Sequence, residues 1–270
     1  MKNFFFALFL LVAFASCKQE SIAVKDITGK NQISMEDMVA FTKLASTNYD
    51  GYVGFTISNT ANNTLNSNSM PRIYATFKDK ASGNLIDAGS MEINSYKMTA
   101  NSQNIYDNLT DVFTSEENRK TARTFWGKKV NISVGKKSGA ENLTVLDANH
   151  GLPSELYGSF SSGSNFSRTG TITWNQDPNN QKGNYIFISF RPEGLNNDAF
   201  VSYPLTKKVL SVPDNGYYQF SPSDFDGIPF GAFISISCAR GTYTEIKGND
   251  GSSEYLIYAY TSISDARPID

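Results

Sequence analysis

Most of the chain alternates apolar and polar residues with a period of two, in short runs that Asn, Gly, Asp and Ser separate. This period places successive side chains on opposite faces of a β-strand, and the separating residues favour turns. The first half has four such runs, at residues 51–58, 72–79, 89–98 and 128–135. The second half has six, at residues 170–175, 184–192, 199–205, 216–221, 231–240 and 254–263. The pattern predicts an all-β protein built from antiparallel sheets.

The composition changes at residues 150–166, HGLPSELYGSFSSGSNF, which are rich in Gly, Ser and Pro and contain scarcely an apolar run of strand length. We therefore place a domain boundary near residue 158. Roughly 250 residues follow the N-terminal segment described below, enough for two domains that each have a core. The prediction is two tandem antiparallel β-sandwiches, at residues 46–158 and 159–270.

The N-terminus carries an apolar block at residues 4–14 after a single Lys2. The block is too short to span a bilayer as a helix, but it fits the apolar region of a signal peptide. The order Phe14-Ala15-Ser16-Cys17 resembles the bacterial lipobox, although the first position is not the usual Leu. The resemblance implies a signal peptide at residues 1–16 and acyl chains on Cys17 that anchor the protein to a membrane.

Residues 17–45 are predicted to form a lipidated tether and a short helix. The helix is expected after Ser34, where an acidic first turn precedes apolar residues on one face. Lys18-Gln19-Glu20 resembles the short charged signal that sends lipoproteins of the Bacteroidetes type to the outer-membrane surface. This implies an outer-membrane location in the cell envelope and leaves open whether the chain faces the surface or the periplasm.

About 110 residues of the second half resemble the fibronectin type III and wider immunoglobulin-like family. TGTITWNQDPNNQKGNYIFISFRP is similar to the second and third strands of that family, with Trp174 at the place of its core tryptophan. FDGIPFGAFISI places Phe233 four residues after Pro229, where the family usually has tyrosine. Phe233 lacks the hydroxyl that makes the corner hydrogen bond of the family. The resemblance implies that the sandwiches are immunoglobulin-like.

The order of features also resembles a group of two-domain lipoproteins of the Bacteroidetes type, which mostly lack an assigned activity. The shared features are the lipobox, DAGSMEIN, TITWN, VPDNGYYQFSPSDF and IPFGAFISISCARG.

The charge pattern excludes some classes of partner. The formal net charge is −2, and Lys128-Lys129, Lys136-Lys137 and Lys207-Lys208 are isolated basic pairs that read as solvated strand ends and turns. We therefore expect no nucleic-acid partner. If Cys17 is lipidated, Cys238 has no disulfide partner, and its alternating surroundings predict a buried, unreactive thiol.

No set of residues in the sequence assembles into a recognisable catalytic or metal site. His150 is the single histidine, and we interpret it as a residue of a surface loop. The carboxylate pairs Glu116-Glu117 and Asp224/Asp226 lie in polar turns, where solvation keeps pKa values ordinary. Two acidic stretches, 221–227 and 247–254, lack the spacing of an EF-hand. We predict no catalytic residue, no metal and no cofactor.

The high aromatic content is the feature most open to interpretation. Tyr258 and Tyr260 alternate onto one strand face and Tyr255 onto the other, so packing within the sheet accounts for part of the set. The contact surface is expected in the loops at 61–70, 193–198 and 240–253, and the ligand residues stay unknown. The favoured function is non-catalytic binding or adhesion to a glycan or a protein. The alternatives are a structural subunit of an envelope complex and a carbohydrate hydrolase.

Overall fold

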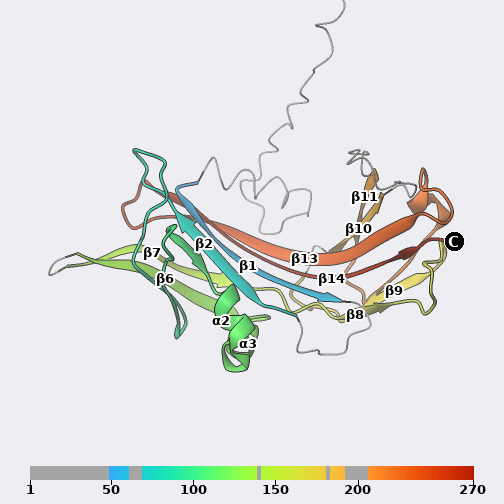
Figure 1. Cartoon of the computed structure of the whole chain (residues 1–270), viewed down its shortest axis with the longest axis horizontal. Helices are drawn as coiled ribbons and strands as arrows, with labels where there is room; N and C mark the ends of the chain where they lie inside the picture. The colour runs from blue at the N-terminus through green and yellow to red at the C-terminus, as the bar shows by residue number, and fades with distance from the viewer. Residues whose placement is uncertain (1–48, 61–68, 139–140, 181–182, 192–205) are drawn as a thin grey trace, which may run out of the picture. The chain divides into compact units, whose positions relative to one another are not determined.

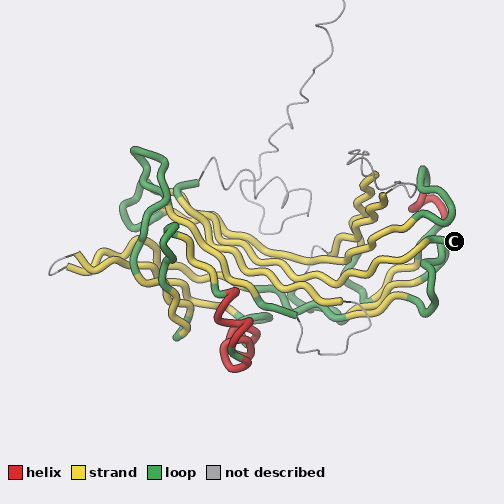
Figure 2. The backbone as a smooth tube through the Cα atoms, viewed as in Figure 1, coloured by secondary structure: helices red, strands yellow, loops and turns green. Residues whose placement is uncertain are grey.

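The computed structural model describes residues 49–60, 69–138, 141–180, 183–191 and 206–270 (Figure 1). The chain divides into the units Met1–Lys30 and Asn31–Asp270, and every described residue belongs to the second unit. The described residues form strands β1–β14, helices α2 and α3 and one 3-10 turn, η1, so the predicted all-β class is confirmed. Figure 2 shows how little of the backbone is helical. Cys17 and the helix expected after Ser34 lie outside the described residues.

A seven-stranded sheet draws strands from both halves of the sequence, in the order β11-β10-β13-β14-β1-β2-β5. The last strand, β14, lies between β13 and β1 and pairs with β1 in parallel, whereas the other pairs are antiparallel. The strands are β1 (Gly51–Thr60), β2 (Arg72–Phe77), β5 (Ile105–Asp107), β10 (Asn184–Arg191), β11 (Thr206–Val212), β13 (Phe233–Lys247) and β14 (Glu254–Pro268).

The hairpin of β13 and β14 runs through both halves of this sheet. Each strand has 15 residues, and they pair without interruption from Phe233 and Pro268 to Lys247 and Glu254. The strands predicted at 231–240 and 254–263 are therefore extended, and residues 240–247 form strand where a loop was expected. Asp250 closes the turn by accepting the backbone N–H groups of Ser252 and Ser253, as the predicted Asn-Asp-Gly turn requires.

Two smaller antiparallel sheets complete the structure. The order in one is β4-β3-β6-β7, and the order in the other is β12-β9-β8. Their strands are β3 (Ser90–Ile93), β4 (Tyr96–Met98), β6 (Lys129–Ser138), β7 (Glu141–Gly151), β8 (Gly158–Phe160), β9 (Thr171–Trp174) and β12 (Tyr217–Gln219). The remaining elements are α2 (Leu109–Thr114), α3 (Glu116–Arg123) and η1 (Pro222–Phe225).

Most of the buried apolar side chains form two clusters on the seven-stranded sheet. The first core joins β1 and β2 to the four-stranded sheet, and the second joins β10 and β13 to the three-stranded sheet. One face of β14 serves both cores, since Ile257 lies in the first and Ile263 in the second. Along the chain the change occurs between Leu152 and Leu156, close to the boundary placed near residue 158.

Several local predictions differ from the structure. Residues 89–98 form the two strands β3 and β4, because Asn94 adopts a left-handed conformation (φ 53°) and turns the chain. The helices α2 and α3 and the strands β5, β7, β8 and β11 were not predicted. Ser115 begins α3 by accepting the backbone N–H of Asn118, a capping arrangement that polar turns and helix starts share in sequence. Residues 61–68 and 192–205, which include the expected contact loop at 193–198 and the strand predicted at 199–205, lie outside the described residues.

Across the described parts of the chain, we find no helix with the length and apolar character needed to cross a membrane.

Candidate functional site

His150 lies in β7, so its interpretation as a residue of a surface loop is wrong. It is 2% exposed, and its Nε2 and Nδ1 lie 3.1 and 2.9 Å from the Oγ1 atoms of Thr242 and Thr244 on β13. Because the Thr242 hydroxyl donates to the carbonyl of Gly151, it accepts from Nε2–H, and Nδ1 accepts from Thr244. Burial lowers the pKa of His150 to about 4, so the ring is neutral at pH 7.

Cys238 shares a fully buried face of β13 with Ile234 and Ile236. Burial raises the pKa of its thiol, which keeps the sulfur protonated and unreactive. The prediction of a buried thiol is confirmed.

One carboxylate of each pair singled out in the sequence has a structural partner. Glu116 begins α3 and pairs with Lys120 at 2.8 Å. Asp224 closes a capping box with Ser221 in η1 and accepts the Tyr218 hydroxyl at 3.0 Å. The two acidic pairs belong to elements that pack on different cores. Among residues that the structure describes, no three His, Cys, Asp or Glu side chains gather as a metal site would require.

A buried ion pair lies where the two cores meet. Arg240 of β13 and Asp214 have side chains that are 1% and 3% exposed, with 3.0 Å between Nη1 and Oδ2. Arg240 also donates to the carbonyl oxygens of Ser154, Glu155 and Asn175. The carboxylate of Asp214 also accepts hydrogen bonds from four other groups. They are the Trp174 indole N–H, the Asp177 backbone N–H and the side-chain amides of Asn180 and Asn184. Hydrogen bonds to protein groups therefore replace the water that would surround both charges in solution.

The same region fixes residues 153–157, which connect the two cores. The carbonyl of Pro153 accepts from the N–H of Gly127, and the N–H of Leu156 donates to the hydroxyl oxygen of Thr261. The Asn59 amide donates to the carbonyl of Leu156. Together with the hydrogen bonds of Arg240, these bonds attach the connecting segment to β1, β13 and β14. The segment in which we placed the domain boundary is therefore held against the sheet.

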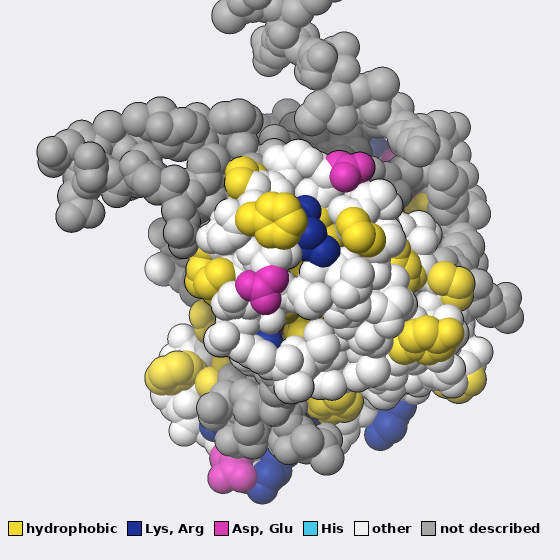
Figure 3. Space-filling view, turned by 90° about the vertical axis from the view of Figure 1, so that its right-hand side faces the viewer, with side chains coloured by type: hydrophobic (Ala, Val, Ile, Leu, Met, Phe, Trp, Pro, Cys, Tyr) yellow, Lys and Arg dark blue, Asp and Glu magenta, His cyan; other side chains and the backbone are white. Residues whose placement is uncertain are grey.

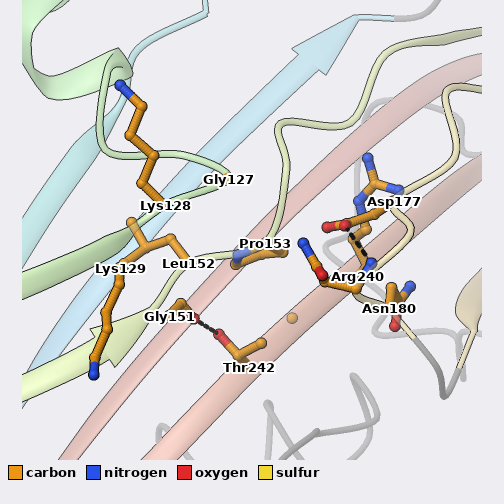
Figure 4. Close-up of a pocket in the computed structure, with 12 residues that line it drawn as sticks. Gly127, Lys128, Lys129, Gly151, Leu152, Pro153, Asp177, Asn180, Arg240 and Thr242 are labelled. Carbon is orange, nitrogen blue, oxygen red and sulfur yellow. Dashed lines mark hydrogen bonds between the residues drawn. The ribbon is translucent and has the colours of Figure 1, made fainter.

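A pocket of about 280 Å³ opens beside this ion pair (Figure 4). We call it the junction pocket. Four segments line it: the start of β6, the end of β7, the loop after β9 and the middle of β13. Its lining residues include Lys128, Lys129, Leu152, Pro153, Asp177, Asn179 and Thr242. The two lysines are exposed, as their interpretation as a solvated strand end predicts.

The three-stranded sheet presents a second polar surface, which we call the outer face. Alternation sends Ile172 and Trp174 into the second core, so Thr171 and Thr173 point away from it. Their cross-strand neighbours are Tyr217 and Gln219 on β12 and Ser159 on β8, with Ser161 following β8. Tyr217 is 55% exposed. Beside it, Ser159, Ser161, Thr171, Thr173 and Arg267 line a hollow of about 470 Å³.

Hydrogen bonds order the side chains of the outer face. Ser159 and Thr173 join their hydroxyls at 2.9 Å, and the Thr171 hydroxyl donates to the Gln219 amide oxygen at 2.9 Å. Arg267 is paired with Asp265 and donates to the carbonyls of Ser161 and Gly163. The face thus offers a fixed row of hydroxyl and amide groups next to one open aromatic ring.

The end of the second unit that carries β8, β9 and η1 is largely uncharged, with hydrophobic side chains set among polar groups (Figure 3). Phe230 is the most exposed large apolar residue described, at 78%, and it lies over the guanidinium of Arg168 at 4.2 Å. Three carbonyl groups, from Phe225, Ile228 and Asp270, accept from Arg168 and hold it in place.

The tyrosines of β14 are divided as the alternation predicts. Tyr255 packs on Phe77 in the first core, with 5.8 Å between ring centroids. Tyr258 lies on the opposite face, across Gly54 and 6.2 Å from the ring of Tyr52. Packing within the sheet therefore accounts for these rings, and Trp174 is buried in the second core.

The comparisons with known proteins identify no relative: no family model matches the chain, and no curated protein is significantly similar to it.

Sequence reasoning missed the ion pair and the outer face. The sequence contains a pattern that indicates each of them. Arg240 continues the buried series Ile234, Ile236, Cys238 at the same spacing, which indicates an inward-facing cation. The outer face follows from the polar positions of TITWN, but its neighbours on β8 and β12 come from distant parts of the chain.

We expect replacement of Arg240 by Met to lower the free energy of unfolding by about 3–5 kcal/mol, because it leaves Asp214 buried without a counter-charge. Urea denaturation followed by fluorescence measures the change. Arg72→Met is the matched control, since the Arg72 side chain is 43% exposed and its pair with Asp107 is worth about 1 kcal/mol or less. Equal losses in the two variants would contradict a special role for the junction.

The pH dependence of the free energy of unfolding should reveal the lowered pKa of His150. The folded pKa of about 4 lies below the ordinary 6.5, so between these values the unfolded chain binds a proton that the folded chain does not. The free energy of unfolding should therefore fall by about 3 kcal/mol as pH drops through this window, and the contribution is complete above pH 6.5. Urea midpoints from pH 4.5 to 7.5 test this. The His150→Gln variant should lack this fall of the urea midpoint between pH 6.5 and 4.5. If the midpoints of the variant and the unchanged protein fall in parallel, the attribution to His150 is wrong.

Proposed function

We propose that the protein is a non-catalytic lipoprotein of the cell envelope that binds glycans through the outer face. The observation that carries the proposal is the ordered row of Ser159, Thr171, Thr173 and Gln219 beside the exposed ring of Tyr217. Hydroxyl and amide side chains can both donate to and accept from sugar hydroxyls. An exposed tyrosine ring supplies an apolar surface on which a sugar ring can stack.

The size and charge of the outer face fit this ligand class. The hollow of about 470 Å³ has the volume of a small-ligand site. Arg267 is its one charged lining residue, and Asp265 compensates that charge. A surface of this kind favours neutral, hydroxylated ligands over ions.

The non-catalytic part of the proposal rests on how the reactive groups are used. His150 is neutral and bonded on both ring nitrogens, and Cys238 is fully buried. Asp214 and Asp177 serve as acceptors for buried N–H groups. These groups build the fold, so we assign them no chemical step and keep the hydrolase alternative below binding.

The membrane part of the proposal rests on the lipobox. We propose that Cys17 is lipidated after removal of residues 1–16 and anchors the chain to the outer membrane, with no nucleic-acid partner and no cofactor. A subunit role in an envelope complex is the second candidate, and the exposed Phe230, held over Arg168, favours it because such rings often anchor protein interfaces.

The division into an N-terminal β domain at 46–158 and an immunoglobulin-like sandwich at 159–270 stays a prediction. The two separate cores support it. The seven-stranded sheet argues against two fully separate domains, because β1 of the first half pairs with β14 of the second.

Tyr217→Ala should abolish or strongly weaken glycan binding, by about tenfold or more, because it removes the only stacking surface of the outer face. Purified protein is applied to arrays of bacterial, plant and host glycans and matrix proteins, and hits are titrated. Phe113→Ala is the matched control, since Phe113 on α2 is 70% exposed and contributes nothing to the outer face. Binding that Tyr217→Ala leaves intact, or binding to proteins alone, would refute the glycan site.

Cys17→Ala should move the protein from the membrane fraction to the soluble fraction, since two or more acyl chains anchor stably at about 0.8 kcal/mol per buried CH₂. Fractionation of cells that express each form, with metabolic labelling by a fatty-acid analogue, measures this. Cys238→Ala is the control, because that thiol is buried. Labelling that persists in Cys17→Ala would contradict the anchor.

A further inference from the structure

We propose that residues 34–45, which the sequence predicts to form a helix with one apolar face, dock on the face of the seven-stranded sheet that points away from both cores. We call this surface the back face. Alternation along four neighbouring strands gives it large aromatic and apolar side chains. They are Tyr52 of β1, Tyr74 of β2, Tyr243 of β13, and Leu256, Tyr258 and Tyr260 of β14. None of the six belongs to the first or the second core.

The centre of the back face is buried, although no sheet or helix among the described residues covers it. Tyr243, Leu256 and Tyr258 are 4, 0 and 8% exposed. Both smaller sheets and the helices α2 and α3 pack on the opposite side, where their apolar side chains join the two cores. Neighbours in the same sheet, such as Tyr52 beside Tyr258, contact a side chain at its flanks and leave its outward end open. The low exposure therefore indicates that another part of this chain lies over the face.

The internal segments outside the described residues do not suit this role. Residues 61–68 are almost entirely polar (ANNTLNSN). Residues 192–205 join β10 to β11 at the end of the sheet where Arg191 pairs with Phe233, far along β13 from Tyr243. That separation is about 33 Å, whereas a loop of this length that is anchored at both ends reaches only about 25 Å. The other internal gaps are too short.

The chain ahead of the described residues enters at the back face. The Tyr49 hydroxyl donates to the carboxylate of Glu245 on β13, and Glu245 is the cross-strand neighbour of Leu256. Only residues 46–48 separate Tyr49 from the predicted helix, and this link spans at most about 14 Å. The connection therefore keeps the helix next to the buried centre of the back face.

The predicted helix carries a surface that matches the back face. Met38, Phe41 and Leu44 recur on one side of it. A helix over residues 34–45 is about 18 Å long. The four strands that form the back face span about 14 Å, since neighbouring strands lie about 4.8 Å apart. The helix is thus long enough to cross all four strands, and docking removes apolar side chains of both partners from water.

A docked helix has two consequences for the proposed function. It closes the ring cluster of Tyr52, Tyr74 and Tyr258 to ligands, which keeps sugar stacking at Tyr217 of the outer face. It also shortens the free chain between Cys17 and the sheet to residues 18–33, a consequence that rests on the lipidation proposed above. Docking itself depends on neither lipidation nor glycan binding, so its test can fail or succeed separately from theirs.

Hydroxyl-radical footprinting of the purified protein, read by mass spectrometry, tests the cover because it reports the exposure of each tyrosine side chain. We expect Tyr243 and Tyr258 to be oxidised about tenfold more slowly than Tyr217, in proportion to their exposed fractions of 4, 8 and 55%. Equal rates at the three tyrosines would show an open back face and overturn the proposal. Slow rates that rise on dilution of the protein would assign the cover to a second copy and would also overturn it.

The Phe41→Asp variant tests whether residues 34–45 form the cover. A carboxylate on the apolar side of the helix should weaken docking, so oxidation of Tyr243 and Tyr258 should rise about fivefold. Lys43→Asp is the matched control, because two positions along a helix turn the new side chain by about 200°, to the polar side. It should change neither rate. Unchanged rates in Phe41→Asp, or equal rises in the two variants, would contradict docking of this segment.

Met91 reports whether a variant keeps its fold, because it is fully buried in the first core. Its oxidation should stay slow in Phe41→Asp. If it rises, the milder Phe41→Ala variant decides the question, since it removes apolar contact without adding a charge. Oxidation of Tyr243 and Tyr258 that is about twofold faster, with Met91 still protected, supports docking. No change at these tyrosines in Phe41→Ala would refute it.

Discussion

The ion pair of Arg240 and Asp214 is the interaction on which the meeting of the two cores depends. Removing two charges from water is costly, and the pair alone would not offset that cost. Here three backbone carbonyls surround the guanidinium, and an indole, a backbone N–H and two side-chain amides surround the carboxylate. These partners come from the connecting segment, from β9 and the loop after it, and from β10, and Asp214 itself lies in the turn after β11. A single pair thereby positions three loops that differ widely in sequence position.

This arrangement explains why two separate apolar clusters share one sheet. Between Ile257 and Ile263 the inward face of β14 carries the buried Thr261, and the facing part of β13 carries Arg240. The polar interval divides the apolar interior, while the backbone ladder of the long hairpin continues through it. His150 adds a second polar link, from β7 to the two threonines of β13. The outer face and the junction pocket are thus both supported by ordered backbone, although they lie in different parts of the fold.

The strands and turns were largely predictable, because alternation and turn residues are local signals. The runs at 51–58 and 128–135, the Asn249-Asp250-Gly251 turn and the buried Cys238 all follow from them. Pairing was not predictable, because which strands meet depends on contacts distant in sequence, as Gly51 with Tyr255 shows. The same limit applies to the sites. Tyr217 and Ser159 both carry suitable side chains, but only the placement of β9 between them makes a common surface.

The position of β14 has a consequence for how the chain acquires its structure. This strand contributes to both cores, and one of its two neighbours in the sheet, β1, lies about 200 positions earlier in the chain. The first core cannot close when its own half of the sequence emerges, because Tyr255 and Ile257 are still missing. An N-terminal half that has already left the ribosome must wait, with apolar strands uncovered, for residues 254–268. The first core therefore closes only after these residues have joined it, and until then its strands are open to the contacts that favour aggregation.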